Sequence, residues 1–175
     1  MGVRLNIGCG SKLLKGYINC DIEKNHSGVK PDVVCDMGGE LPFDRDYADE
    51  IICIHAIEHF PFWMHENILR EFKRVLKPGG LLAIEVPSMD KVIQHFIRTA
   101  KEAVPYHLTW GALYGDNNFP EDSMLHKWCF SERQMIALFE EINYENIEVK
   151  PVKFHLEKRD MRVEGTKPKM EAKDA

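Results

Sequence analysis

The chain has 175 residues, a formal net charge of −5 and a sequence pI near 5.9, and its basic residues are scattered up to the C-terminal segment. This length fits one domain with a single substantial core, and we expect no second catalytic domain. Without a basic patch there is no electrostatic footprint for nucleic acid or an anionic membrane, so a small-molecule substrate fits better.

The cysteines and the apolar runs indicate the compartment. The five cysteines show no paired metal spacing, and four fall in or beside expected strands, so we expect reduced core residues: Cys9, Cys20, Cys35, Cys53 and Cys129. No apolar run approaches the ~20 residues of a membrane span, and the N-terminus lacks a signal-peptide pattern. We therefore expect a cytoplasmic protein that binds neither membrane nor nucleic acid.

An alternating apolar strand at residues 3–7 runs directly into a glycine turn, Gly8-Cys9-Gly10. Such a turn lets the backbone approach a ligand closely, because no Cβ blocks it and glycine adopts φ > 0 easily. The next strand-like run, 17–21, ends in Asp21, whose carboxylate could accept hydrogen bonds from both hydroxyls of a ribose. A strand-end aspartate can also form a turn. Nucleoside binding is the first hypothesis for this region.

Short apolar runs bounded by Gly, Pro and Asp predict five strands, at residues 3–7, 17–21, 32–36, 50–54 and 81–86. Between the last two, apolar residues recur at helical spacing, namely Ile68, Phe72, Val75 and Leu76. The Pro-Gly-Gly at 78–80 ends this helix. The strand-helix-strand unit predicts an α/β fold with a mostly parallel sheet.

A second helix is predicted in the C-terminal part of the chain. Ser131 and Gln134 can form a capping box, and an apolar face follows at Met135, Leu138, Phe139 and Ile142. This helix leads into strands at 146–149 and near 153–156. From residue 158 the sequence is charged and loses apolar periodicity, so we expect a single domain at 1–157 and a flexible tail at 158–175.

Residues 88–130 form a long insertion before this helix. A helix over 90–102 is expected to end before Pro105, and an aromatic-rich loop follows it. Loops beyond the carboxyl ends of strands are where α/β proteins place substrate contacts. The loop residues predicted to contact a substrate are Tyr106, Trp110, Tyr114, His126 and Trp128. Aromatic residues at this density would also pack on one another without a ligand.

His55, Glu58 and His59 spell H-x-x-E-H, a spacing that suits zinc when it lies on one helix. His55, however, directly follows the apolar run 51–54 and is expected at a strand end. Two ligands four residues apart need a helical turn to face one ion. We therefore expect no metal.

Five motifs in order resemble the small class I S-adenosylmethionine-dependent methyltransferases of the type 11 kind. Each motif alone is weak, but their order is specific, and the resemblance covers roughly residues 3–150. The motifs are the Leu-Asn-Ile-Gly-Cys-Gly at 5–10, Asp21, the Cys-Asp-Met at 35–37 with Leu-Pro-Phe at 41–43, the run at 54–60 and the Leu-Lys-Pro-Gly-Gly-Leu-Leu at 76–82. Two positions depart from the pattern: many relatives have an acid in place of Asn6 and a third glycine in place of Lys12.

The resemblance implies S-adenosylmethionine as the cofactor and a Rossmann-like sheet whose last strand is antiparallel. The short, loop-like connections between the first strands predict few helices in the N-terminal half. The resemblance also implies that Asp21 binds the ribose, that Asp36 binds the adenine amino group, and that the backbone at 55–56 contacts the methionine part. The full set of expected cofactor-binding residues is Asn6, Gly8, Cys9, Gly10, Asp21, Ile22, Asp36, Met37, His55, Ala56 and His59.

His126 and His59 are the candidate catalytic residues. His126 could accept a proton from a nucleophile, and His59 is either a base or a structural residue that packs beside the cofactor loop. Methyl transfer demands little of protein side chains, because holding the nucleophile, methyl carbon and sulfur in line supplies much of the acceleration. We expect transfer to an oxygen or nitrogen of a small acceptor. Similar short methyltransferases are often linked with sugar or polysaccharide precursors.

Two other classes stay open. A dinucleotide-binding oxidoreductase shares the strand, the glycine turn and the strand-end acid, but here Lys12 replaces the third glycine. The second class is a protein that keeps the cofactor site without catalysis, or an interaction module. The sequence identifies neither the acceptor nor the oligomeric state, which we expect to be monomer or homodimer.

The strands also predict that one face of the sheet is thinly covered. Only nine residues, 8–16, separate the first two strands, so no full crossover helix fits there. Polar residues such as Asn6, Asn19 and Glu85 alternate with apolar ones, unlike the continuous apolar runs of a sheet buried on both faces. The 90–102 helix is the first expected cover for this face, a second copy of the chain is the next, and partial solvation is the third.

Overall fold

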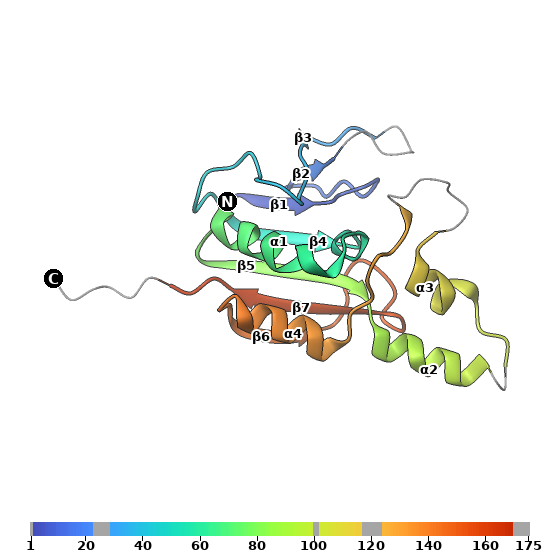
Figure 1. The fold of residues 1–175 in the computed structure, drawn as a ribbon. Coiled ribbons are helices and arrows are strands. Elements are labelled where there is room, and N and C mark those ends of the chain that lie inside the picture. Colours follow the sequence, from blue (N-terminus) through green and yellow to red (C-terminus); the bar gives the residue numbers. More distant parts are fainter. Residues whose placement is uncertain (1, 23–28, 100–101, 117–123, 170–175) are drawn as a thin grey trace.

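In the computed structural model the chain is described at residues 2–22, 29–99, 102–116 and 124–169. A seven-stranded sheet forms the centre, in the order β3-β2-β1-β4-β5-β7-β6, and β7 is the antiparallel strand (Figure 1). The strands are β1 (Arg4–Ile7), β2 (Ile18–Asp21), β3 (Val33–Val34), β4 (Ala48–Ile54), β5 (Leu76–Pro87), β6 (Glu145–Lys150) and β7 (Asp160–Thr166). The Rossmann-like, mostly parallel sheet is confirmed.

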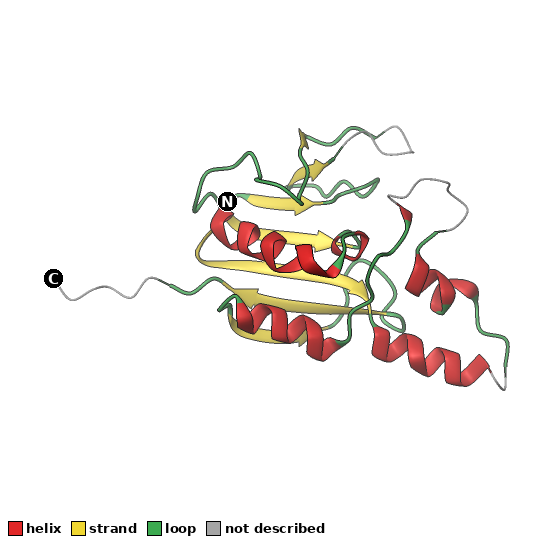
Figure 2. Cartoon of the chain, in the orientation of Figure 1, coloured by secondary structure: helices red, strands yellow, loops and turns green. Residues whose placement is uncertain are grey.

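Helices cover one face of this sheet (Figure 2). Both α1 (Phe62–Val75) and α4 (Glu132–Glu141) pack there, and their apolar residues join the main core with those of β1, β4, β5 and β7. The predicted capping box is present, because the Ser131 hydroxyl accepts from the Gln134 N–H while the Gln134 side chain accepts from the Ser131 N–H. Burial of these apolar residues is the main stabilising contribution to the fold.

The opposite face is covered by loops, and the described residues place no helix on it. Its small apolar cluster consists of Ile52, Ile54 and Ala83, against which Leu14, Tyr17 and Phe154 pack. Beside this cluster the buried Arg162 donates to Glu85 at 2.8 Å, and Glu85 also accepts from the backbone N–H groups of residues 153 and 154. The loop between β6 and β7 is therefore anchored on a buried charge.

The predicted cover for this face is wrong. Helix α2 (Met89–Thr99) lies beyond the carboxyl end of β5, next to α3 (Trp110–Tyr114) and the 3₁₀ turn η2 (Tyr106–Leu108) (Figure 1). Residues 12–17 and the loop before β7 cover the sheet instead. Phe96 of α2 packs on the insertion itself, with its ring 4.8 Å from that of Trp110, whereas Ile93 is exposed. The end of the predicted helix at 100–101 lies outside the described residues.

The last strand was also predicted in the wrong place. Residues 153–156 are a loop, and β7 runs through Asp160–Thr166, so the domain boundary at 157 and the tail from 158 are wrong. Met161 and Val163 face the helix-covered core, whereas Arg162 between them is neutralised by Glu85. Because the charged Arg162 lies inside this buried strand, the strand was not recognised from the sequence. Residues 170–175 lie outside the described part of the chain.

Candidate functional site

A cavity of about 510 Å³ lies at the carboxyl ends of β1 and β4. One end is formed by the glycine turn, including Gly8, Cys9 and Gly10. The other end is formed by residues from the turn after β4, from the insertion and from the loop before β7, among them His55, His59, Tyr106, His126, His155 and Arg159. This is the position at which parallel α/β sheets bind ligands.

The glycine turn is held tightly against β2 and η1 (Ile57–His59). The backbone N–H groups of Gly8 and Cys9 both donate to the Cys20 carbonyl at 2.9 Å. Gly8 has φ +71°, and a Cβ placed on it would lie 2.3 Å from the Cβ of Ala56. A side chain on Gly10, with φ +50°, would meet nothing within 4 Å. Glycine is therefore needed at Gly8 for packing, while Gly10 leaves open space at the cavity.

Asn6 and Lys12 shape this end of the cavity. The buried Asn6 amide donates to the Lys12 carbonyl and to the Asn19 side chain, both at 2.9 Å. Lys12 reaches across the sheet and donates to the Phe154 carbonyl at 2.6 Å. The residues that depart from the sequence pattern of the resemblance thus tie the glycine turn to the loop before β7.

Asp21 and Asp36 accept hydrogen bonds from backbone N–H groups. Asp21 accepts from the N–H groups of Gly10 at 2.6 Å and Ile22 at 2.8 Å, and Asp36 accepts from the Gly38 N–H at 2.8 Å. Binding of the ribose by Asp21 and of the adenine amino group by Asp36 stays a prediction. Asp21, Ile22, Asp36, Met37 and Ala56 lie outside the cavity lining, whereas Asn6, Gly8, Cys9, Gly10, His55 and His59 are part of it.

The five predicted substrate residues do not all line the same hollow. Tyr106 and His126 line the cavity. His126, Tyr114 and Trp128 line a second hollow of about 750 Å³. Trp110 is 51 % exposed and stacks on Tyr114 at 6.0 Å between ring centroids. The insertion does pack on itself, as one alternative expected, and it also presents two of the five residues to the cavity.

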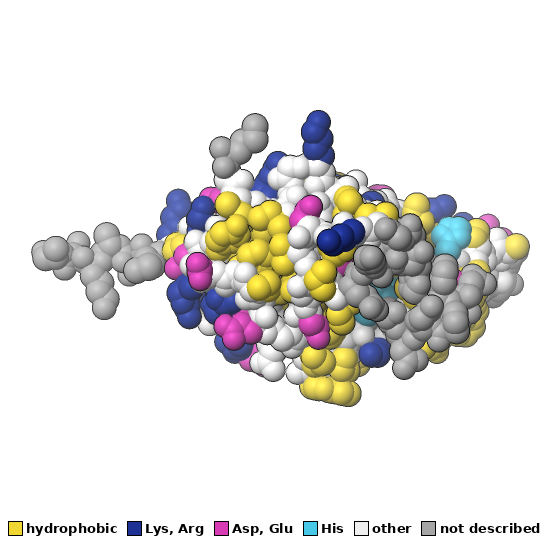
Figure 3. All heavy atoms as spheres, turned by 90° about the horizontal axis from the view of Figure 1, so that it is seen from above, with side chains coloured by type: hydrophobic (Ala, Val, Ile, Leu, Met, Phe, Trp, Pro, Cys, Tyr) yellow, Lys and Arg dark blue, Asp and Glu magenta, His cyan; other side chains and the backbone are white. Residues whose placement is uncertain are grey.

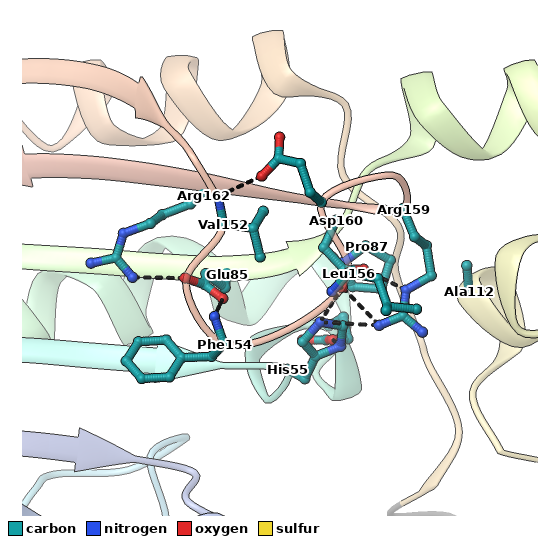
Figure 4. Close-up of polar contacts among 12 residues, drawn as sticks. His55, Glu85, Pro87, Ala112, Val152, Phe154, Leu156, Arg159, Asp160 and Arg162 are labelled. Carbon is teal, nitrogen blue, oxygen red and sulfur yellow. Dashed lines mark hydrogen bonds and ion pairs between the residues drawn. The ribbon is translucent and has the colours of Figure 1, made fainter. Parts of the chain in front are cut away.

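His55 lies at the centre of a buried charge network (Figure 4). Its φ of +49° turns the chain out of β4, and its ring contacts Glu58 and Asp160, each at 3.2 Å. Burial disfavours the charged imidazole, but the two carboxylates outweigh this and raise the pKa of His55 to about 9. Arg159 also binds Asp160, at 2.5 Å from Nε to Oδ1. His55 therefore carries a positive charge next to the cavity at neutral pH.

A second cluster joins Glu58, His59 and His126. Burial raises the pKa of Glu58, but the neighbouring histidines, His55 foremost, lower it to about 2, so this wholly buried carboxyl is ionised. Burial lowers the pKa of His126, and its ring lies 4.9 Å from that of His59. The backbone N–H groups of residues 127 and 128 donate to the Glu58 carbonyl, at 2.8 and 3.1 Å. This pairing brings the aromatic loop to η1.

Sequence reasoning missed Arg159 and Asp160, which fall in the segment taken for a tail, and His155, which falls in a segment taken for a strand. His155 stacks on His55 with ring centroids 4.0 Å apart, and burial lowers its pKa to about 4. The apolar spacing of Met161 and Val163 was the available signal for a buried strand. A strand at that position would have placed Asp160 beside the end of β5.

Comparisons with known proteins agree with this architecture. The profile of a family described as Methyltransferase domain matches residues 5–84. Demethylmenaquinone methyltransferase of Bacillus cytotoxicus is 28% identical over 138 residues, which are 75% of this chain and 54% of that protein. The enzyme of that name from Bacillus cereus strain AH187 is 29% identical over 121 residues, covering 66% of this chain and 48% of the relative. The chain spans about half the length of these curated relatives.

Solved structures show the same fold. A S-adenosylmethionine-dependent methyltransferase from Methanosarcina mazei aligns with a TM-score of 0.61 at 18% identity, over 96% of this chain and 93% of the other. The Burkholderia thailandensis 1,6-didemethyltoxoflavin-N1-methyltransferase, solved with its substrate and S-adenosylhomocysteine, aligns with a TM-score of 0.63 at 15% identity, over 95% and 71% of the two chains. The chain thus resembles methyltransferases over residues 5–84 and has the fold of S-adenosylmethionine-dependent methyltransferases.

On the face seen in Figure 3, basic side chains are dispersed among acidic and apolar ones. None of the described helices is long and apolar enough to cross a membrane.

Proposed function

We propose that the chain transfers a methyl group from S-adenosylmethionine to a small acceptor that enters the cavity from the insertion side. The observation that carries this proposal is that one cavity is lined by both the glycine turn and the pair His59 and His126. In this arrangement the adenosine lies toward Asp21 and Asp36, and the methyl group points toward the histidines. The family match supports the donor half of the reaction.

The acceptor end favours a flat aromatic ring that carries a hydroxyl or an amine. Tyr106 and the imidazoles of His107 and His126 line that end, and such rings stack on an aromatic acceptor. The matching relatives include enzymes named for demethylmenaquinone, a quinone. A sugar or polysaccharide precursor is the second candidate, favoured by the residues of the cavity that can accept or donate hydrogen bonds.

The transfer itself is a displacement at carbon. The acceptor oxygen or nitrogen forms a bond to the methyl carbon, the carbon–sulfur bond breaks, and its electron pair stays on sulfur to give S-adenosylhomocysteine. Alignment of these three atoms supplies much of the acceleration. A hydroxyl must also lose its proton, and His126 offers a nitrogen lone pair for this, either by taking the proton or by binding a Lewis acid. His59 and His126 are thus the proposed catalytic residues.

The test is transfer of labelled methyl from S-adenosylmethionine by the full chain. Hydroxylated quinols, phenols and free sugars are offered separately, and products are identified by mass spectrometry. We expect label in a product from the aromatic set. Gly8→Val provides the control, because its side chain would collide with Ala56 and close the turn. If S-adenosylhomocysteine fails to bind, the proposal is wrong.

A further inference from the structure

Glu58 is a buried carboxylate, and His55 is its close partner. The Glu58 side chain is 0 % exposed, and its Oε2 has no hydrogen-bond partner among the described residues. Its one close charged neighbour is His55, whose Nδ1 lies 3.2 Å from Oε1. The nearby N–H groups of residues 127 and 128 donate to the Glu58 backbone carbonyl instead. Buried ionised oxygens are normally satisfied, so Oε2 in particular calls for a ligand.

The two histidines beside Glu58 have fixed tautomers. His126 Nδ1 lies 2.9 Å from the Ala112 carbonyl oxygen, and His59 Nδ1 lies 3.0 Å from that of Leu125. A carbonyl oxygen only accepts, so each Nδ1 carries the proton and each Nε2 has a lone pair. Histidines that bind metals donate their other ring N–H to a carbonyl or carboxylate in this way.

The spacing of these groups also suits a cation. His126 Nε2 lies 4.0 Å from Glu58 Oε1, and both atoms present lone pairs. One ligand atom from each of Glu58, His59 and His126 lies within 4.8 Å of the other two. An ion that makes bonds of about 2.0–2.2 Å to imidazole nitrogen and carboxylate oxygen can bridge the 4.0 Å between His126 Nε2 and Glu58 Oε1. Without an ion, two acceptors face each other across a buried gap.

We propose that Glu58, His59 and His126 bind a divalent transition-metal ion such as Zn²⁺. Two imidazoles and one carboxylate are a ligand set that leaves coordination positions open. His59 and His126 line the cavity, so these positions face the acceptor end. The H-x-x-E-H motif alone did not predict this site. His55 belongs to the group with His155 and Asp160, and the third ligand, His126, comes from the insertion.

The ion has a role in methyl transfer, and this role rests on the proposed function. A divalent ion lowers the pKa of a hydroxyl that it coordinates. The hydroxyl proton then leaves to solvent through the open cavity, and the oxygen attacks the methyl carbon. The ion also selects acceptors that carry an oxygen at the position next to the methyl group.

A neighbouring group provides a matched control. His55, His155 and Asp160 also offer ligand atoms within 4.8 Å of one another. Both oxygens of Asp160 are occupied, however, because Arg159 binds Oδ1 at 2.5 Å and Oδ2 at 2.8 Å. A cation there would have to replace an arginine. His155→Ala therefore removes a cavity histidine without removing a proposed ligand.

The experiment is titration of the metal-stripped full chain with Zn²⁺ by calorimetry, and with Co²⁺ by visible absorption. We expect one ion per chain. His126→Ala and Glu58→Gln are expected to weaken Zn²⁺ binding by more than about 100-fold, because changes even outside the ligand shell cost about 10–100-fold. His155→Ala is expected to bind as the wild type does. Circular dichroism and S-adenosylhomocysteine affinity show that each variant is folded.

The outcomes are separable from those of the proposed function. Absence of Zn²⁺ binding, or an equal loss in His155→Ala and His126→Ala, overturns the metal site while leaving cofactor binding in place. Zn²⁺ binding that is lost with the ligands, in a chain that also binds S-adenosylhomocysteine, supports both. A chain that binds Zn²⁺ but not S-adenosylhomocysteine supports the metal site and overturns the methyltransferase.

Discussion

The two faces of the sheet are built differently and have different roles. The face under α1 and α4 is a continuous apolar core that includes the wholly buried Phe72 and Phe139. The opposite face has a small apolar cluster, a buried Arg162–Glu85 ion pair and two loops. The loops of this second face carry Lys12, His155 and Arg159 to the cavity. Stability thus comes mainly from one face, and the other face positions the site.

The largest expected effect is on the helix-covered face. Phe72→Ala is expected to lower the free energy of unfolding by about 4 kcal/mol, because it leaves a cavity in the packed core. Denaturant unfolding measures this. Phe62→Ala on the same helix, at a residue that is 49 % exposed, is the control and is expected to cost below about 1 kcal/mol. Similar losses in both would show that α1 does not anchor the core.

The loop-covered face is tested through its ion pair. Arg162→Met is expected to cost about 3 kcal/mol, because Glu85 is left as a buried charge without its cation. Arg70→Met, which breaks an exposed pair with Glu66, is expected to cost about 0.3–0.5 kcal/mol. A small effect of Arg162→Met would mean that water or another group already compensates Glu85.

His126→Ala is expected to lower turnover by about 100-fold while cofactor affinity changes little, because its ring faces the acceptor end of the cavity. Steady-state kinetics with an acceptor from the labelling screen measures this. Lys127→Ala, at the exposed neighbouring residue, is expected to retain turnover. An equal fall in turnover and cofactor affinity, together with a lower melting temperature, would assign His126 a packing role.

The smallest expected effect concerns the ribose. Asp21→Ala is expected to weaken S-adenosylhomocysteine binding by ~1–3 kcal/mol, because a charge-assisted hydrogen bond to ribose is lost. Calorimetry measures this, and Asp44→Ala, at an exposed loop aspartate, is the control. Unchanged affinity in a folded Asp21→Ala chain would show that Asp21 does not bind the ribose. Its role would then be the hydrogen bonds that it accepts from the Gly10 and Ile22 N–H groups.

Local patterns predicted the helix-covered half of the molecule well. The strands β1, β2 and β4, the helix α1 and the Ser131 capping box follow from apolar spacing and turn residues that the packing does not override. The glycine turn was recognised for the same reason. These features depend on neighbours in the sequence, and the sequence displays them directly.

Long-range polar pairing is what the sequence concealed. Arg162 is a buried strand residue only because Glu85, far away in the chain, pairs with it. The cluster of Glu58, His59 and His126 depends on the aromatic loop donating to the Glu58 carbonyl, a contact that has no periodic signature. Residues near 160 were assigned to a tail because their partners were unknown.

The central claim is that the cavity beside the glycine turn binds S-adenosylmethionine. Differential scanning fluorimetry of the full chain with S-adenosylhomocysteine, with NAD and without ligand tests it most directly, because a ligand that binds the native state raises the melting temperature. We predict a higher melting temperature with S-adenosylhomocysteine and no change with NAD. Stabilisation by NAD alone would contradict the account and favour a dinucleotide-binding oxidoreductase.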